Sequence, residues 1–290
     1  YPALLAVAGA AGGWSVAGLK AIGGVSILLL VLCTFTLARR HLGLGLATFV
    51  TLAVGFQPDV LVEAAHLGSD VPFLAMSTLS LLLIFLQHER AASGRPWSWW
   101  LALAVALTIG VAFAIRSNGA VLACTYAAML GLAALRGERP WRETIVHGLG
   151  FAALMAGCVG VYFATLPDGS LVHASYLSAD PAVWARRLLA HLHAIANWVT
   201  LNRIPGVAKM LPLGVMLGLL AWGAVRRAKE AAILLVYLAL HLVLLTVFPF
   251  DGGQRYYHPL LPAAFLLVGF GLQAAGERIA SAAGPAWSGV

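Results

Sequence analysis

The stretch "AAILLVYLALHLVLLTVF", residues 231–248, contains no Asp, Glu, Lys or Arg. An uncharged apolar segment of about 18 residues or more is long enough to cross a bilayer as a helix. The whole chain shares this character, because 61% of its 290 residues are hydrophobic and only 10% are charged. Soluble domains carry about 25% charged residues. We therefore predict an all-α, polytopic membrane protein, and the composition disfavours the alternative of a soluble helical bundle.

Similar apolar runs, separated by charged connections, predict about nine transmembrane helices in one domain that covers residues 1–290. Interfacial helices on the outer face are expected in addition. The chain begins with Tyr1 and shows no basic segment followed by an apolar signal region, so we expect a truncated N-terminus. The predicted spans lie near residues 21–38, 43–60, 71–87, 98–115, 119–135, 144–165, 210–225, 231–248 and 258–275.

The charges alternate between the two sides that these spans define. By the positive-inside rule, the connections rich in Lys and Arg face the cytoplasm. The other side receives Arg116 and Arg255 and every Asp of the chain, so we predict a polar extracytoplasmic face in a plasma (inner) membrane protein. The net charge of +7 then reflects topology and not nucleic-acid binding. The predicted cytoplasmic residues are Arg39, Arg40, Arg90, Arg95, Arg136, Arg139, Arg142, Arg226, Arg227, Lys229 and Arg278.

The long connection, about residues 167–209, contains the segment "ADPAVWARRLLAHLHAIANWV". Asp180 stands at a helix N-cap position and Pro181 at the first helical position. Apolar residues recur at helical spacing behind them, which predicts an amphipathic helix on the membrane surface. His191 and His193 are two residues apart, so a helix would point them to different faces, and a metal site on that pair is not expected.

The first polar stretch at the predicted outer rim is "QPDVLVEAAHLGSDVPFL", residues 57–74. If the preceding helix continues, Glu63 and His66 share one face and form a possible half-site for a divalent cation. A hydrogen bond between the two is the alternative. Asp70 precedes the next apolar run, where it suits either a helix N-cap or a functional carboxylate.

Two further stretches place arginines at the same rim. Arg116 lies in "FAIRSNGAVLA", and Arg255 lies in "PFDGGQRYYHPLLP" beside Tyr256 and Tyr257. Arginines and tyrosines are ordinary interfacial residues, and Asp251 is an alternative partner for Arg255. An arginine flanked by phenols at headgroup depth also suits a lipid phosphate, through charge-assisted hydrogen bonds.

The order of these pieces resembles the membrane glycosyltransferases of the C fold (GT-C). The segments concerned are "YPALL", "LARRHLGLGLATFVTLAVGFQP", "AHLGSDVPFLAMSTLSLLLIF", "AIRSNGAVL" and "QRYYHPLLP", spread from residue 1 to about 275. The similarity is to the dolichyl-phosphate-mannose protein mannosyltransferases (glycosyltransferase family 39) and the lipid A aminoarabinose transferases. These families move a sugar from a polyprenyl phosphate to an acceptor on the outer or lumenal face.

The resemblance implies a role for each candidate residue. Asp70 matches an acidic residue that the family needs for activity. Arg255 and Tyr256, followed by two prolines, match the family's Arg-Tyr-x-x-Pro-x-x-Pro signature near the donor phosphate; Tyr257 would brace the phosphate as well. Arg116 falls in a loop that often carries Lys or Arg. Glu63 and His66 lie near positions with acceptor or metal contacts in some members.

The resemblance also implies that the loop carrying the catalytic base would precede Tyr1. The expected partners are the bilayer, a polyprenyl-phosphate sugar as donor, and a lipid, glycan or protein acceptor. A divalent metal is possible. The alternative function is a multi-pass transporter or lipid flippase, which would use ionisable residues within a span such as His147 or His241. A non-catalytic membrane scaffold is a third possibility.

Overall fold

A computed structural model of the chain describes residues 5–6, 9–10, 15–66, 68–164, 181–199, 208, 210–247 and 254–282. These residues form helices and short turns, with no strand among them. The helices are α2 (Val16–His41), α3 (Leu44–Gly55), α4 (Pro58–Ala65), α5 (Asp70–Ala92), α6 (Trp99–Ile115), η1 (Ser117–Gly119), α7 (Ala120–Leu135), α8 (Trp141–Ala164), α9 (Pro181–Val199), α10 (Met210–Arg226), α11 (Ala228–Val247), η4 (Gln254–Leu260) and α12 (Leu261–Ala282).

Each of the nine predicted spans corresponds to helix in the described ranges, so the all-α membrane architecture is confirmed. Among the described residues, six helices are long and apolar enough to cross a membrane alone, and α3 with α4 makes a seventh, bent span. The remaining two, α6 and α10, have 17 residues each, which is at the lower limit for a spanning helix. The chain is a multi-pass membrane protein.

The predicted second span is broken where a straight helix was expected. α3 ends at Gly55 and α4 begins at Pro58, with a bend of 48° between them. Proline has no N–H to donate, and it disfavours helical backbone in the residue before it. Gln57 occupies that preceding position, and its side chain accepts a hydrogen bond of 2.8 Å from the N–H of Val60. The break therefore has a local cause, and α4 receives its own N-terminal cap.

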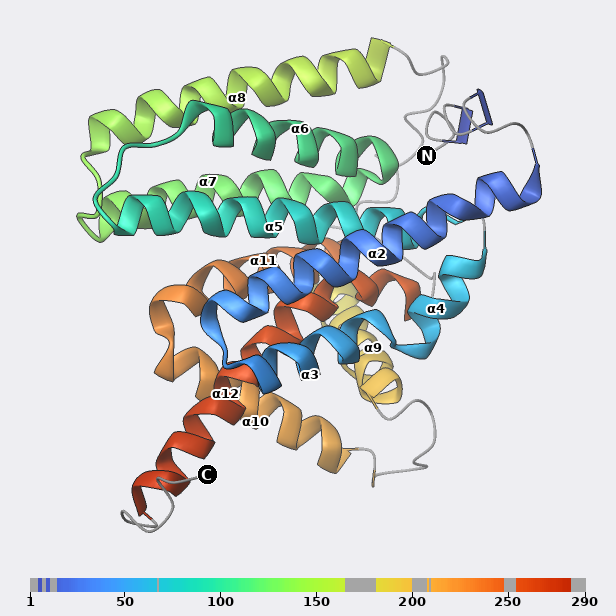
Figure 1. Cartoon of the computed structure of the whole chain (residues 1–290), viewed down its shortest axis with the longest axis vertical. Coiled ribbons are helices and arrows are strands. Elements are labelled where there is room, and N and C mark those ends of the chain that lie inside the picture. Colours follow the sequence, from blue (N-terminus) through green and yellow to red (C-terminus); the bar gives the residue numbers. More distant parts are fainter. Residues whose placement is uncertain are drawn as a thin grey trace.

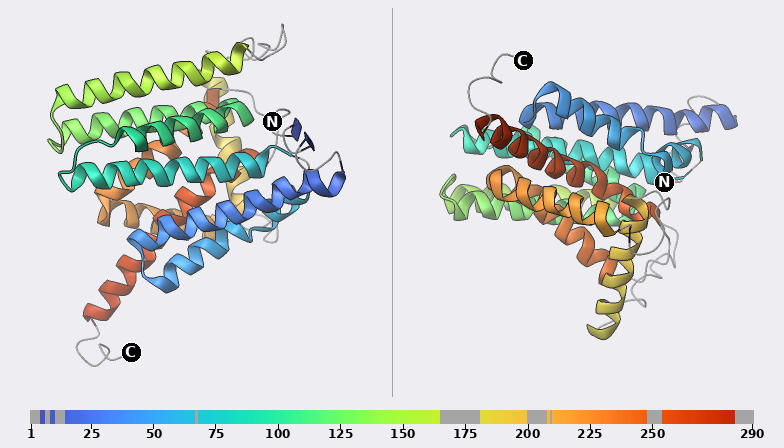
Figure 2. Two further views of the ribbon diagram at one scale, coloured as in Figure 1. Left: turned by 45° about the horizontal axis from the view of Figure 1, so that its top comes forward. Right: turned by 90° about the horizontal axis from the view of Figure 1, so that it is seen from below.

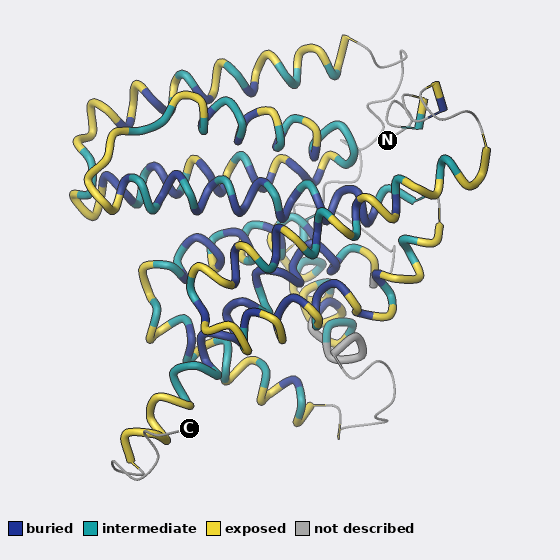
Figure 3. Tube along the Cα trace, viewed as in Figure 1, coloured by how far each residue is buried: buried dark blue, intermediate teal, exposed yellow. Residues whose placement is uncertain are grey.

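The helices form two adjoining groups, α5 to α8 and α2 to α4 with α9 to α12 (Figure 1). Most of them run roughly parallel or antiparallel to one another, whereas α9 runs across this direction (Figure 2). α5 lies at the centre, and 78% of its most apolar 18-residue segment is buried. α8 lies at the edge, and 17% of its corresponding segment is buried. Figure 3 shows the corresponding exposed side along α8. The exposed apolar side chains of α8, such as Leu149 and Val161, suit contact with lipid.

The two ends of the bundle differ in charge. At one end, which we call the basic end, α2, α5, α7, α10 and α12 finish and the predicted cytoplasmic Arg and Lys residues gather. Glu89 of α5 binds Arg40 of α2 there, with both carboxylate oxygens 3.0 Å from the arginine Nε. At the opposite end, the site end, α4, α6 and α11 finish and α5 and α7 begin.

α10 and α12 cross with their backbones almost in contact. A Cβ atom added at Gly223 would lie 2.3 Å from the carbonyl oxygen of Leu267, and one added at Gly271 would lie 2.1 Å from that of Leu219. Small residues allow this close approach between helices in a membrane. The two glycines thus fix the spacing of α10 and α12, both of which contribute residues to the apolar pocket described below.

We expect Gly271→Ala to lower the free energy of unfolding by about 1–3 kcal/mol, because the added methyl group meets backbone that cannot move aside. Thermal unfolding in detergent measures the change. Gly218→Ala on α10 is the matched control, because nothing lies within 4 Å of a Cβ at that position. Equal unfolding temperatures for the two variants would contradict the close packing of α10 on α12.

Candidate functional site

Residues far apart in the sequence meet at the site end of the bundle. Asp70 is the first residue of α5, and Arg116 follows the last residue of α6. The carboxylate of Asp70 and the guanidinium of Arg116 form an ion pair, with 7% and 15% of their side chains exposed. The N-cap position of α5 belongs to Ser69, whose side chain makes no capping bond. Asp70 therefore does not act as the N-cap that its position suggested, and it neutralises Arg116 instead.

A tight turn holds Arg116 in place. The N–H of Arg116 donates to the carbonyl of Ala112, and its own carbonyl accepts from the N–H of Gly119, both at 2.9 Å. A Cβ on Gly119 would lie 2.5 Å from the backbone nitrogen of Phe113, so a larger residue would open the turn. The sequence "IRSNG" therefore stops α6 and presents the guanidinium toward α5.

Tyr256 brings a second guanidinium into the same cluster. Its ring centroid lies 4.8 Å from Cζ of Arg116 and 5.3 Å from Cζ of Arg255. Both distances are within the range of attractive cation–π contacts. Arg255 is exposed and makes no ion pair within the described part of the chain. The predicted alternative partner, Asp251, lies outside the described residues. We call Asp70, Arg116, Arg255 and Tyr256 the arginine cluster.

The carboxylates of Glu63 and Asp70 both lie next to Gly68. Oxygens of both side chains are 3.6 Å from the position that a Cβ on Gly68 would occupy. This places a second acidic group beside the arginine cluster, without an ion pair of its own in the described residues. The cluster thus has a cationic side at Arg255 and an acidic side at Glu63.

The premise that Glu63 and His66 share a helical face is wrong. α4 ends at Ala65, and His66 has extended backbone (φ −92°, ψ 156°) while its N–H donates to the carbonyl of Glu63 at 3.2 Å. No group of three or more potential metal ligands occurs among the described His, Cys, Asp and Glu residues. Because Asp70 is also neutralised by Arg116, the described residues do not fit a divalent cation, and no step is assigned to one.

Two histidines that the sequence did not single out as site residues also lie here. His258 is 1% exposed and lies close enough to Asp70 and Arg116 to interact with their charges. His191 of α9 hydrogen-bonds the hydroxyl of Tyr257 at 2.6 Å. Consequently Tyr257 does not join Tyr256 in the arginine cluster. Successive residues of a 3₁₀ helix point about 120° apart, so adjacent tyrosines reach different neighbours.

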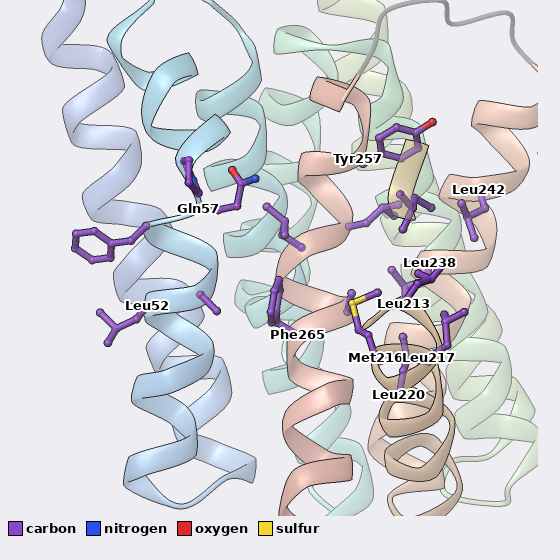
Figure 4. A pocket seen from close by; sticks show the side chains of 17 residues that line it. Leu52, Gln57, Leu213, Met216, Leu217, Leu220, Leu238, Leu242, Tyr257 and Phe265 are labelled. Atoms are coloured by element: carbon purple, nitrogen blue, oxygen red, sulfur yellow. The ribbon is translucent and has the colours of Figure 1, made fainter. Parts of the chain in front are cut away.

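An apolar pocket of about 500 Å³ shares the short helix η4 with this site. Its walls come from α3, α4, α9, α10, α11, η4 and α12, and leucines dominate the lining (Figure 4). Gln57 and Tyr257 lie toward one end of the pocket, whereas Leu220 lies toward the other (Figure 4). Tyr257 belongs to η4, the short helix that also carries Arg255 and Tyr256. The polar end of the pocket is therefore built from the same short helix as part of the arginine cluster.

The size of this pocket is within the range of about 300–1,000 Å³ that small-molecule sites occupy. Its lining residues are Leu52, Ala53, Phe56, Gln57, Pro58, Ile195, Leu213, Met216, Leu217, Leu220, Leu238, Leu242, Tyr257, Leu260, Leu261, Ala264 and Phe265. A ligand of this pocket would be apolar over most of its length, with a polar group at the end near η4.

Comparison with solved structures identifies the architecture. The crystal structure of ArnT from Cupriavidus metallidurans, bound to undecaprenyl phosphate, superposes with a TM-score of 0.60 over 96% of this chain. The chain has the GT-C fold. The GT-C likeness seen in the sequence segments is thereby confirmed at the level of the fold, together with the multi-pass helical architecture.

This chain corresponds in structure to only part of the longer ArnT chain. The sequences are 17% identical, and this chain spans about half (52%) of the ArnT chain. No family model and no curated protein sequence matches this chain. The likeness is therefore one of fold, and the chemistry has to be argued from the residues of the site end.

Proposed function

We propose that this GT-C chain acts in transfer of a sugar from a polyprenyl-phosphate donor to an acceptor at the extracytoplasmic face of the membrane. One observation carries the proposal: the short helix η4 lines an apolar pocket through Tyr257 and also carries Arg255, whose exposed guanidinium forms no ion pair with the described residues. A polyprenyl phosphate has the matching form, with a long apolar chain and an anionic head. The undecaprenyl phosphate bound to the structurally similar ArnT supports the same class of ligand.

The arginine cluster provides the groups that such a donor needs. Arg255 would bind the phosphate through charge-assisted hydrogen bonds, and its contact with Tyr256 would hold the guanidinium over the polar end of the pocket. Arg116, tied to Asp70, would supply a second cation close by. A pocket of about 500 Å³ encloses only the part of a long isoprenoid nearest the phosphate, and the rest would extend into lipid.

The reaction would proceed by attack of an acceptor hydroxyl on the anomeric carbon of the sugar. The new bond joins that oxygen to the anomeric carbon, and the bond from this carbon to the phosphate oxygen breaks. Negative charge then develops on the departing polyprenyl phosphate, where preorganised cations stabilise it most effectively. The hydroxyl proton passes to a general base. We assign this role to none of the described residues.

The acidic side of the site would face the acceptor. Glu63 is suited to hydrogen-bond an acceptor hydroxyl, because its carboxylate is not committed to a cation among the described residues. Asp70 is suited to a different role, since it orients Arg116 through their ion pair. We assign Asp70 as a positioning residue and Glu63 as an acceptor contact.

The distribution of charge supports an extracytoplasmic site. Arginines and lysines concentrate at the basic end of the bundle, which the positive-inside rule assigns to the cytoplasm. The arginine cluster lies at the opposite end. A donor carried in the membrane and presented on the outer leaflet would reach it directly.

Ala264→Phe tests the pocket in this proposal. Ala264 lines the pocket on α12, so the added ring would occupy space that we assign to the isoprenoid. We expect sugar release from a radiolabelled polyprenyl-phosphate donor to fall by about tenfold or more at subsaturating donor, the equivalent of about 1.4 kcal/mol. The assay requires the full-length protein in proteoliposomes with an acceptor extract.

The control is Ala280→Phe, near the end of α12 and exposed, which we expect to leave turnover unchanged. Equal rates for the two variants would contradict the pocket assignment. Sugar that crosses the membrane while remaining on its lipid would contradict the transferase proposal and support the flippase alternative.

A further inference from the structure

Two side chains one turn apart attach α9 to the end of α11. Nη1 of Arg187 donates to the carbonyl of Val247 at 2.9 Å and to that of Thr246 at 3.4 Å. Nε2 of His191 lies 2.9 Å from the carbonyl oxygen of Leu245. The last carbonyls of a helix have no partner within it. α9 therefore supplies hydrogen-bond donors for the end of α11.

The second nitrogen of His191 reaches a different element. Nδ1 lies 2.6 Å from the hydroxyl oxygen of Tyr257 in η4. A carbonyl can only accept, so Nε2 carries the hydrogen toward Leu245, and in the neutral ring Nδ1 accepts from the Tyr257 hydroxyl. Both side chains are buried, at 8% and 4% exposure. His191 thus bridges the end of α11 and η4 from a third element.

This bridge occurs where the two parts of the proposed donor site meet. Tyr257 lines the apolar pocket, and the preceding residue, Tyr256, contacts both guanidiniums of the arginine cluster. Ile195, one turn beyond His191 on α9, lines the same pocket. A shift of η4 would move Tyr256 relative to Arg116 and would alter the polar end of the pocket at the same time.

We propose that His191 is a positioning residue for donor binding, acting through Tyr257. By holding the Tyr257 hydroxyl against the fixed end of α11, His191 keeps η4 in the register that places Arg255 and Tyr256 at the polar end of the pocket. The inference rests on the proposed function, and it assigns α9 the task of aligning the phosphate-binding part of the site with the isoprenoid-binding part.

A double-mutant cycle on His191→Ala and Tyr257→Phe tests this inference. Binding of undecaprenyl phosphate and of undecaprenol is measured for the wild type, both single variants and the double variant. We expect each single variant to bind the phosphate about tenfold more weakly while binding of the alcohol is unchanged. The double variant should be no weaker than either single one, because both remove the same hydrogen bond.

His193→Ala is the control, because this side chain is exposed on the same helix, and it should bind like the wild type. Effects that add in the double variant would overturn the inference, as would equal weakening for phosphate and alcohol. Tyr257→Phe removes a single oxygen and keeps the ring. Full affinity of this variant for undecaprenyl phosphate would therefore overturn the inference, even if His191→Ala fails to fold. A wild type that binds no undecaprenyl phosphate would instead defeat the proposed function.

Discussion

Asp70→Asn is expected to abolish sugar transfer and to destabilise the protein. The substitution leaves the Arg116 guanidinium, with 15% of its side chain exposed, without its carboxylate. Removing one partner of a buried ion pair costs about 3 kcal/mol. Arg116 also loses its orientation toward the donor phosphate, so we expect kcat/KM to fall by about 100-fold or more. Thermal unfolding and a transfer assay measure the two effects.

A second variant separates the loss of stability from the loss of activity. Asp70→Asn combined with Arg116→Gln removes both charges, so the unfolding temperature should recover most of its wild-type value while transfer remains lost. Glu277→Gln is the control, since Glu277 lies exposed near the basic end, where its carboxylate accepts a hydrogen bond from Gln273 one turn away. Recovery of transfer in the double variant would show that the ion pair serves the fold alone.

Arg255→Ala is expected to weaken binding of undecaprenyl phosphate by about 10- to 100-fold, since a hydrogen bond to a charged group contributes about 1.5–3 kcal/mol. Stability should change little, because Arg255 is exposed and makes no ion pair within the described residues. Arg255→Lys should recover part of the affinity, because lysine keeps the charge and loses the planar, two-pronged donor. Equilibrium binding in detergent or nanodiscs measures these differences.

Arg278 offers a matched control for Arg255. Its Cζ lies 5.7 Å from the ring of Trp222, an arrangement like that of Arg255 on Tyr256, but at the basic end of the bundle. Arg278→Ala should therefore leave binding unchanged. An equal loss of affinity in both variants would mean that general attraction to anionic lipid explains the result, and the assigned role of Arg255 would then be wrong.

The sequence predicts the fold of this protein well because the bilayer restricts it strongly. A span requires about 20 apolar residues whose backbone groups are satisfied internally, so the runs between charged connections locate the helices directly. The exact ends of the helices are predicted less accurately. Pro58 could have predicted the break in the second span, since the residue before proline rarely continues a helix. The glycine at position 68 gave a similar indication that His66 lies outside a helix.

The site is only partly predictable from the sequence. Asp70, Arg116 and Arg255 could be singled out as charges at the ends of apolar runs, but the choice of partners could not be foreseen. The ion pair joins residues 46 positions apart, and the His191–Tyr257 bond spans 66 positions. Such contacts depend on how the helices pack. The neighbouring residues Tyr256 and Tyr257 look equivalent in sequence, and the helical geometry of η4 sends them to different neighbours.

Photoaffinity labelling tests the location of the donor site most directly. A polyprenyl phosphate with a diazirine in the isoprene units nearest the phosphate is bound to the full-length protein, irradiated, and its sites of attachment are mapped. We predict labelling of pocket residues such as Phe56, Leu217 and Phe265, displaced by undecaprenyl phosphate more effectively than by undecaprenol. Labelling spread along the lipid-facing side of α8, or equal displacement by phosphate and alcohol, would contradict a donor site beside the arginine cluster.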